Sequence, residues 1–175
     1  MLGLGNAWAA AGMLRVLETI RHSKVSREFE GQTANLTSWV EEIVSATWKH
    51  QVSVYGVMVL VFTHNVNIRV PRSQQTNGTL LNVLDDPNSF ADSSSTALLA
   101  ASTFRLAVIT GDYTHLPAAV KAFQLIEDSL TEDGWLLNTV DPLTFNTPSQ
   151  PGVFSPEGQA FTLLLQAAWR DLVEF

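Results

Sequence analysis

Two carboxylates stand out in this sequence because each lies at the start of a stretch of small residues. Asp92 precedes three serines, and Glu157 follows a Ser-Pro pair and precedes a glycine. This pattern is typical of a helix N-terminus, where a carboxylate either contacts a ligand or stabilises the helix itself. Both interpretations stay open for Asp92 and Glu157, and the second needs no ligand because acids are favoured at helix starts in any case.

The other groups that carry chemistry are scattered along the chain. The histidines His22, His50, His64 and His115 lack metal-ligand spacing such as HExxH, and the absence of cysteine excludes thiolate sites and disulfides. The sequence therefore predicts no metal site and no cofactor. The net charge of −7, with few charged residues, argues against nucleic acid as a partner.

No targeting or membrane segment is evident. Residues 1–6 lack a basic region and run directly into a helical pattern, so no secretory leader is expected there. The most apolar stretch, within residues 52–73, is too short to span a bilayer, so no membrane partner is expected. The cellular location stays undecided.

An internal repeat organises the chain. Residues 133–138, DGWLLN, match residues 77–82, NGTLLN, which stand 56 positions earlier, and each is followed by an Asp, a Pro, a polar loop and the small-residue start of a helix. Asp85 and Asp141 occupy equivalent positions, and repetition of an acid favours a role in a turn over catalysis. Repeats of this kind are supersecondary units that bury their apolar faces against neighbours.

The predicted order is helix, helix, extended loop, helix, helix, extended loop, helix. The helices are expected over residues 6–22, from 26 or 33 to 50, from 94 or 95 to 110, from 116 to about 130, and from 155 onward. Asn6 is the expected N-cap of the first helix. The apolar face of this helix is expected to consist of Trp8, Met13, Val16, Leu17 and Ile20. In the second helix, Trp39 and Trp48 both lie on the apolar stripe and are expected in the core.

Residues 52–73 do not fit this plan. Their first half is β-branched and apolar and their second half is polar, which in isolation predicts a strand or hairpin. Removing these 22 residues would join the second helix to the turn at 77–78 by a short connection like that of the second repeat unit. We hypothesise that 52–73 is a non-native insertion, such as a translated retained intron, which transcript reads that always include it would refute.

Residues 2–11, LGLGNAWAAA, resemble the W-x-R-G-N-G-W segment of the six-hairpin glycosidases. The resemblance is closest to glycoside hydrolase family 105, the unsaturated rhamnogalacturonyl hydrolases, with family 88 as a relative. Residues 90–97, FADSSSTA, and 155–161, SPEGQAF, are similar to the motifs that open later inner helices of that family. The resemblance covers nearly the whole chain apart from 52–73.

The resemblance implies an all-α fold in which helical-hairpin repeats form part of an (α/α)6 barrel, with residues 1–175 as a single partial six-hairpin domain. It also implies a cleft at the barrel mouth that hydrolyses unsaturated uronic acids from pectin-derived oligosaccharides. In that mechanism an aspartic acid protonates the sugar C4=C5 double bond and activates water, which differs from the usual paired-carboxylate displacement.

Three departures limit the resemblance. A complete barrel has about twelve helices and this chain supplies about five, so the chain resembles the carboxy-terminal half. The catalytic aspartate of the family lies upstream of the G-N-G-W segment, so no residue here matches it. Leu4 stands where the family often has a substrate-binding arginine, and a carboxylate clamp is therefore missing.

Four residues carry the binding prediction. Asn6 and Trp8 match the family segment, which implies a polar contact and a stacking platform for a sugar, although Asn6 can instead cap a helix and Trp8 can instead be core. Asp92 and Glu157 precede or open inner helices, where carboxylates can bind sugar hydroxyls at the rim. No residue is predicted to be catalytic.

The sequence therefore predicts a fragment of a carbohydrate-active hydrolase that is inactive alone. The alternatives are a non-catalytic helical-repeat protein that binds a partner or sugar, and a truncated gene product without function. Because a partial barrel leaves inner helices uncovered, self-association through these helices is also expected.

Overall fold

The structure, a computed structural model, describes residues 2–51, 60–63, 66–69 and 77–174. Its elements in that part of the chain are five α-helices, one 3-10 turn and two short strands. They are α1 (Gly3–Arg21), η1 (Ser26–Phe29), α2 (Glu30–Trp48), β1 (Leu60–Thr63), β2 (Val66–Arg69), α3 (Ser93–Thr110), α4 (Leu116–Asp128) and α5 (Pro156–Glu174).

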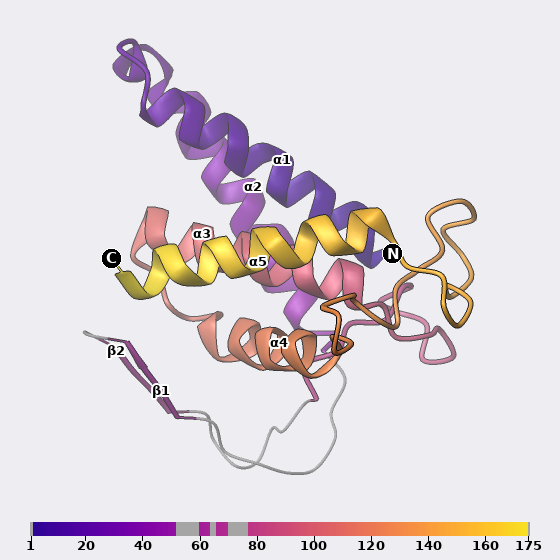
Figure 1. The fold of residues 1–175 in the computed structure, drawn as a ribbon. Helices are drawn as coiled ribbons and strands as arrows, with labels where there is room; N and C mark the ends of the chain where they lie inside the picture. The colour runs from indigo at the N-terminus through magenta and orange to yellow at the C-terminus, as the bar shows by residue number, and fades with distance from the viewer. Residues whose placement is uncertain (1, 52–59, 64–65, 70–76, 175) are drawn as a thin grey trace.

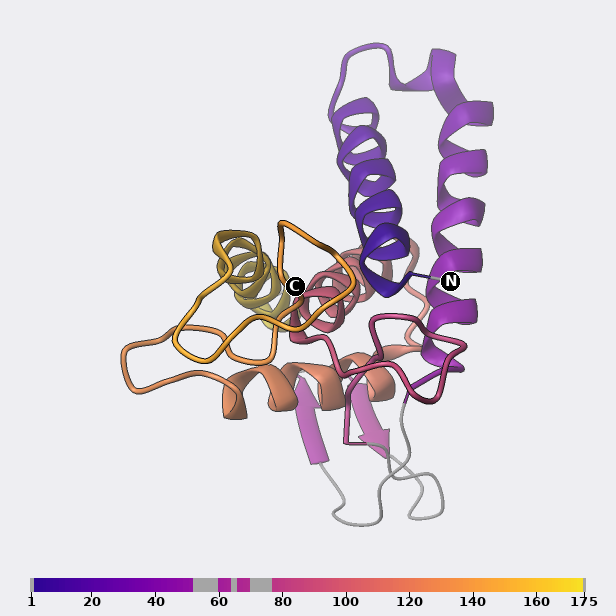
Figure 2. The ribbon, with the colours of Figure 1, turned by 90° about the vertical axis from the view of Figure 1, so that its right-hand side faces the viewer.

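The helices are arranged as two antiparallel hairpins and a single last helix. Figure 1 shows α1 paired with α2, and α4 returning along α3, with α1, α3 and α5 all beginning on the side where the long loops lie. Seen end-on in Figure 2, α3 lies between α1 and α5, while α2 and α4 lie outside this row. The all-α class and the hairpin plan predicted from the sequence are confirmed.

Helix α3 is the centre of the core. Its side chains from Ser93 to Phe104 are all buried, as expected of a helix enclosed by neighbours on every side. Small residues such as Ala97 and Ala100 allow this close approach, while Phe104 fills the space towards Phe123 and Trp169. The core therefore surrounds α3, and the outer helix α2 has fewer buried side chains.

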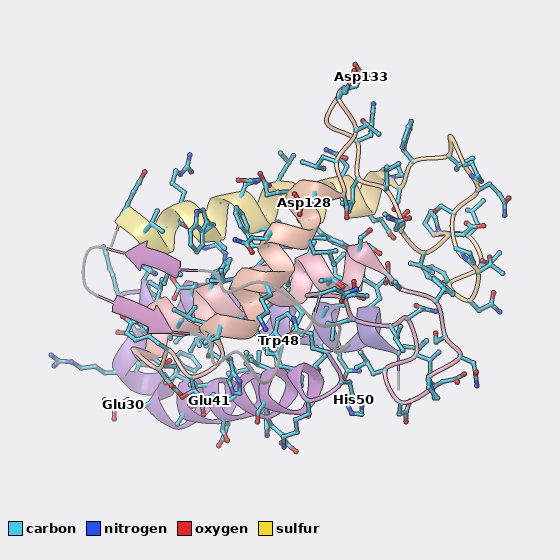
Figure 3. All side chains as sticks on the ribbon, turned by 90° about the horizontal axis from the view of Figure 1, so that it is seen from below. Glu30, Glu41, Trp48, His50, Asp128 and Asp133 are labelled. Carbon is cyan, nitrogen blue, oxygen red and sulfur yellow. The ribbon has the colours of Figure 1, made fainter. Side chains whose placement is uncertain are left out.

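Tryptophan placement in α2 departs in part from the prediction. Trp48 is buried, and its indole Nε1 donates a 2.9 Å hydrogen bond to Thr103 Oγ1 of α3. Trp39, by contrast, has 53% of its surface exposed, so its assignment to the core was wrong. In Figure 3, the labelled Trp48 lies between α2 and the helices above it.

The start of α1 also differs from the prediction. The helix begins at Gly3 with Leu2 as N-cap, so Asn6 lies within the first turns and is not the cap. A tertiary contact explains the earlier start, because the Gly3 N–H donates to the Asn82 carbonyl at 2.8 Å. Of the residues predicted on the apolar face, Leu17 is buried, whereas Trp8 and Val16 are about half exposed. The buried residues of the helix are Gly3, Leu4, Ala7, Ala10, Leu14 and Leu17.

The ends of the later helices follow the sequence signals closely. Asp92 is the N-cap of α3, and Gly111 ends that helix with a left-handed backbone (φ 72°). Pro117 lies in the first turn of α4, where its missing N–H has no helical partner to lose. These predicted boundaries are confirmed within two residues.

The inner helices are α1, α3 and α5. Equivalent backbone hydrogen bonds at the starts of α1 and α3 join each of these helices to the next repeat unit. The first residue of α1, Gly3, donates to the Asn82 carbonyl, and the first residue of α3, Ser93, donates to the Asn138 carbonyl at 3.0 Å. Asn82 and Asn138 are equivalent residues of the repeat. Each of these two helices is thus positioned by the extended segment of the following unit, and we call these two bonds the rim rungs.

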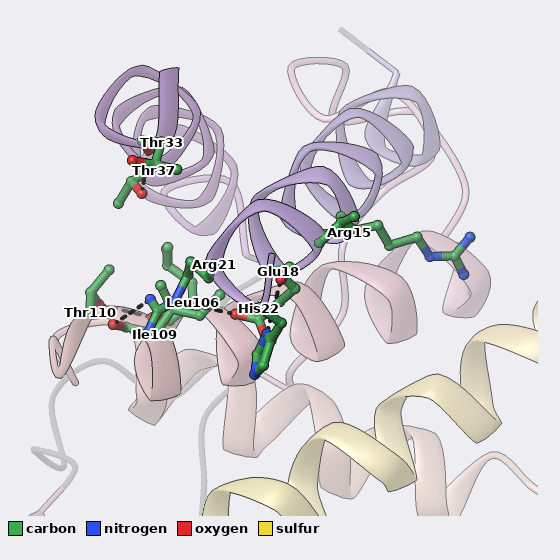
Figure 4. A network of polar contacts seen from close by, with 10 residues as sticks. Arg15, Glu18, Arg21, His22, Thr33, Thr37, Leu106, Ile109 and Thr110 are labelled. Atoms are coloured by element: carbon green, nitrogen blue, oxygen red, sulfur yellow. Dashed lines mark hydrogen bonds and ion pairs between the residues drawn. The ribbon is translucent and has the colours of Figure 1, made fainter. Parts of the chain in front are cut away.

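The opposite ends of α1 and α3 are joined by side chains. Arg21 Nη1 donates a 3.1 Å hydrogen bond to the Ile109 carbonyl in the last turn of α3, and Glu18 pairs with Arg21 at 3.8 Å (Figure 4). A cation is favoured at a helix C-terminus because it meets the negative end of the helix dipole. Arg21 thus joins the last turns of α1 and α3, while the rim rungs join the first turns of these helices to the extended segments.

Residues 52–73 are described only in part. β1 and β2 pair antiparallel, with Leu60 opposite Arg69, which agrees with the predicted hairpin for those eight residues. Residues 52–59, 64–65 and 70–73 lie outside the described residues. The hypothesis that 52–73 is a non-native insertion stays a prediction.

Neither a membrane span nor a metal cluster is found among the described residues. None of their helices combines the length and apolar character needed to cross a bilayer. The same part of the chain holds no group of three or more histidine, aspartate or glutamate side chains arranged to bind a metal ion.

Candidate functional site

Trp8 links the starts of two inner helices. Its ring meets the buried Phe161 of α5 edge-on, with ring centroids 5.2 Å apart and an 85° angle between the planes, while 46% of Trp8 stays exposed. The indole is thus held by packing against Phe161, and close to half of its surface is open to solvent. An aromatic side chain held in this way can stack on the apolar face of a sugar ring.

Glu157 is related to the Trp8 contact through the periodicity of α5. It stands four residues before Phe161, so both side chains lie on the same face of the helix, with Glu157 one turn nearer its start. Glu157 is half-buried, and its carboxylate has no hydrogen-bond or ion-pair partner within the described residues. Of the four predicted binding residues, Trp8 and Glu157 thus lie on two helices that meet at Phe161, with Glu157 one turn of α5 before the ring that Trp8 contacts.

Asp92 is fully buried and its carboxylate is engaged. Oδ1 accepts hydrogen bonds from the backbone N–H groups of Ser94 at 3.0 Å and Val140 at 3.1 Å, and from the Ser94 hydroxyl. Oδ2 accepts from the Ser95 N–H at 3.2 Å. This geometry supports the capping interpretation of Asp92, and the bond to Val140 adds a tie between the two repeat units.

Asn6 lies on a different side of α1 from Trp8, because residues two apart on a helix do not share a face. Its side-chain Nδ2 donates to the Leu2 carbonyl at 2.6 Å, which satisfies a backbone group at the start of the helix. A sugar contact by Asn6 stays a prediction. Such a contact would use the amide oxygen, which accepts no hydrogen bond from the described residues.

Acidic residues of the repeat serve turns, as the sequence indicates for Asp141. Its Oδ1 accepts the Leu143 N–H at 2.8 Å, and in the first unit Asp86 accepts the Asn88 N–H in the same way at 2.9 Å. In the first unit this bond is made by Asp86, one position after Asp85, and Asp85 itself lies in a turn, as predicted.

A notch of about 220 Å³ opens beside Trp8 at the start of α1. It is lined by Leu2, Leu4, Gly5, Trp8, Asn82 and Phe145. Neither Asn82 nor Phe145 was predicted from the sequence as a site residue. Recurrence of an Asn at the same repeat position marks Asn82 as structurally required, whereas the surroundings of Phe145 carry no recognisable pattern.

A larger groove of about 470 Å³ lies further along the inner helices. Its walls include Leu14, Arg15 and Glu18 of α1, with Arg105 of α3 and Leu164 of α5. Arg105 is paired with Asp171 at 3.3 Å. None of the four predicted binding residues lines this groove, and its position halfway along the helices separates it from the loops at the mouth. We therefore place the candidate site at the notch and not in the groove.

No known family's sequence profile matches this chain, and no curated protein matches it in sequence. Solved structures match its fold. A possible member of the GH105 family from Salmonella enterica serovar Paratyphi A matches with a TM-score of 0.70 and 20% identity over 97% of this chain. A possible GH105 member from Klebsiella pneumoniae matches with a TM-score of 0.71 and 20% identity over 96%.

A family 88 glycosyl hydrolase from Bacteroides vulgatus matches with a TM-score of 0.70 and 16% identity over 98% of this chain. These matches cover 40%, 39% and 43% of the respective solved chains, so this chain spans about two fifths of their length. That share agrees with a partial barrel. In fold, this chain corresponds to part of the helical-hairpin barrel of glycoside hydrolases of the GH105 and GH88 type.

Proposed function

We propose that this chain is the sugar-binding part of a glycoside hydrolase that acts on unsaturated uronyl oligosaccharides derived from pectin, and that it is inactive alone. The observation that supports the proposal is the half-exposed Trp8 ring packed on Phe161 at the starts of α1 and α5, with the unpaired Glu157 one helical turn before Phe161. An exposed aromatic ring beside an unpaired carboxylate is a common way to hold a sugar, because the ring covers C–H groups and the carboxylate accepts from hydroxyls.

The proposed inactivity follows from the acids that the chain offers. Cleavage of the unsaturated sugar requires an acid that can protonate the C4=C5 double bond and then activate water. Asp92 is occupied by four donors, and Glu157 is a single carboxylate without a partner acid in the described part of the mouth. We assign Glu157 and Trp8 to substrate binding and Asp92 to holding the rim.

The test uses the whole 175-residue chain and pectin oligosaccharides produced by a lyase, which carry the unsaturated terminal sugar. Binding is followed by chemical-shift changes at the tryptophan indoles, and hydrolysis by loss of ultraviolet absorbance of the double bond. We expect binding without hydrolysis. Trp8→Ala should weaken binding, whereas Trp39→Ala, an equally exposed tryptophan on α2, should leave it unchanged.

The alternatives give distinct results in the same experiment. Hydrolysis by the chain alone would contradict the proposed inactivity. Absence of binding to any of the oligosaccharides would contradict the sugar-binding proposal and favour a helical-repeat protein with another partner, or a product without function.

A further inference from the structure

Phe145 has an unusual backbone conformation next to the notch. Its φ of 59° lies in the left-handed region, which a bulky residue rarely adopts. The other described non-glycine residue with positive φ is Asn138, a type that tolerates this region. Strained positions of this kind persist only where surrounding contacts impose them, and they are concentrated at binding and active sites.

Asn82 supplies the contact that holds Phe145. Its side chain is 2% exposed, and Nδ2 donates a 3.1 Å hydrogen bond to the Phe145 carbonyl. On the other side of the residue, the Phe145 N–H donates to the Asp141 carbonyl at 2.9 Å. The loop is therefore fixed at both backbone groups of Phe145. Phe145 is 51% exposed and is one of the residues that line the notch.

The composition and size of the notch define the ligand that it fits. Two of the six lining residues, Trp8 and Phe145, are aromatic and about half exposed, and Asn82 is the one residue of the six with a polar side chain. The lining contains no charged side chain, and Leu4 is one of its apolar members. At about 220 Å³ the notch is smaller than the roughly 300–1,000 Å³ typical of sites for drug-sized ligands. It suits a single uncharged ring better than a whole oligosaccharide or an anionic sugar.

We propose that the notch binds one uncharged pyranose unit, with Phe145 as the second stacking residue opposite Trp8 and Asn82 as the residue that positions Phe145. This proposal rests on the proposed sugar-binding function and adds the chemical class of one bound unit. A pyranose presents C–H groups on its faces and hydroxyls at its edge. Two aromatic walls cover the faces, and an uncharged lining favours a neutral unit because a carboxylate would lose water without gaining a cation.

The test compares a matched pair of probes, methyl β-D-galactopyranoside and methyl β-D-galacturonoside, which differ in the group at C6. Each is titrated against the whole chain while the indole resonance of Trp8, identified by its loss in Trp8→Ala, is monitored. We expect the neutral sugar to bind and the uronate to bind more weakly. Phe145→Ala should weaken binding of the neutral sugar roughly three- to tenfold, the loss expected for one aromatic contact.

Two control variants separate the ring from the loop that carries it. Leu143→Ala removes an apolar side chain that is 89% exposed in the same loop and does not line the notch, so binding should be unchanged. Asn82→Asp keeps the shape of the side chain but removes the N–H that holds the Phe145 carbonyl. It should weaken binding in the wild-type background and have no further effect in Phe145→Ala, which a general loss of structure would not produce.

The outcomes distinguish this proposal from the function on which it rests. Pectin oligosaccharides that bind with unchanged affinity to Phe145→Ala would overturn the notch proposal and leave sugar binding in place. Preference for the uronate would overturn the assignment to a neutral unit. Absence of binding to every sugar would overturn both proposals. A dimer in sedimentation that Phe145→Ala converts to a monomer would assign the notch to a second copy of the chain and overturn its role in sugar binding.

Discussion

At the scale of single residues, one carboxylate connects the two repeat units. Asp92 caps α3 through Ser94 and Ser95 and also accepts the Val140 N–H from the extended segment of the second unit. The sequence predicted a helix start at this residue because Asp before serines is a strong capping signal. The bond to Val140 could not be predicted, because it joins residues 48 positions apart that no local pattern relates.

We expect Asp92→Ala to lower the free energy of unfolding by about 2–4 kcal/mol, since it removes a helix cap and leaves the buried Val140 N–H without a partner. Urea unfolding followed by circular dichroism measures the change. Ser155→Ala is the matched variant at α5, where the Ser155 hydroxyl accepts only the Gly158 N–H at 3.1 Å, and it should cost about 1 kcal/mol. Equal losses in the two variants would contradict the connecting role of Asp92.

Aromatic side chains show where sequence patterns lose information. Trp39 and Trp48 lie on one helical stripe, yet Trp48 is 7% exposed and Trp39 is 53% exposed. Helical periodicity identifies a face but not how far along the helix a neighbour covers it. Trp8 shows the same limit. How much of its ring is covered depends on Phe161, which lies on another helix and cannot be related to Trp8 by a local pattern. Phe145 was missed altogether, since its conformation depends on a tertiary bond from Asn82.

At the scale of elements, the turns that open the two repeat units are alike in conformation but not in surroundings. Gly78 and Gly134 both have positive φ, at 92° and 82°. A Cβ at Gly78 would stand 2.4 Å from the Lys121 carbonyl oxygen of α4, whereas one at Gly134 would meet nothing within 4 Å. The first turn packs against a helix, while the second projects from the molecule, with Asp133 at its tip in Figure 3.

These surroundings predict different effects for the same substitution. Gly134→Ala should cost about 1–2 kcal/mol, the strain of an L-residue in the left-handed region. Gly78→Ala should cost more, at least 3 kcal/mol in total, because the turn must also move away from the α4 backbone. Thermal and urea unfolding of the two variants would measure both values. A Gly78→Ala variant as stable as Gly134→Ala would show that the turn relaxes freely.

Helix boundaries were predicted well wherever a cap or a stop residue lies in the sequence itself. Asp92 and Gly111 for α3 and Pro117 for α4 are such residues. The start of α1 was predicted three residues late, because its first N–H is satisfied by the Asn82 carbonyl and not by a side chain nearby. Local chemistry therefore defined the elements, while tertiary backbone contacts adjusted their ends.

At the scale of the whole molecule, a partial barrel leaves apolar side chains of its inner helices exposed. Val16 of α1 is 51% exposed and Leu163 of α5 is 66% exposed. Exposed apolar surface on neighbouring helices favours association, because burial of such surface against another copy removes it from water. The general fold was predictable from the repeat, but which surfaces stay open depends on the number of hairpins present.

We expect the isolated chain to self-associate in sedimentation experiments, with a mass that increases with concentration. Leu163→Glu should weaken this association about tenfold or more, because a charge replaces a buried leucine at the contact. Leu143→Glu, in a loop and 89% exposed, should have little effect. A monomer of constant mass across all concentrations would show that the uncovered faces of α1 and α5 do not drive association.

The rim rungs bear on how this array of hairpins could gain further units by duplication. The residue that starts α5 is Pro156, which has no N–H, so this helix cannot make the bond that Gly3 and Ser93 make to the carbonyl of a following unit. A copy of residues 77–132 inserted between α2 and the present first unit would keep every rung, since each copy offers the Asn carbonyl and the serine donor. Helix α5, which begins at Pro156, takes its position without such a bond. Duplication of a unit inside the array would thus preserve the bonds that place the inner helices.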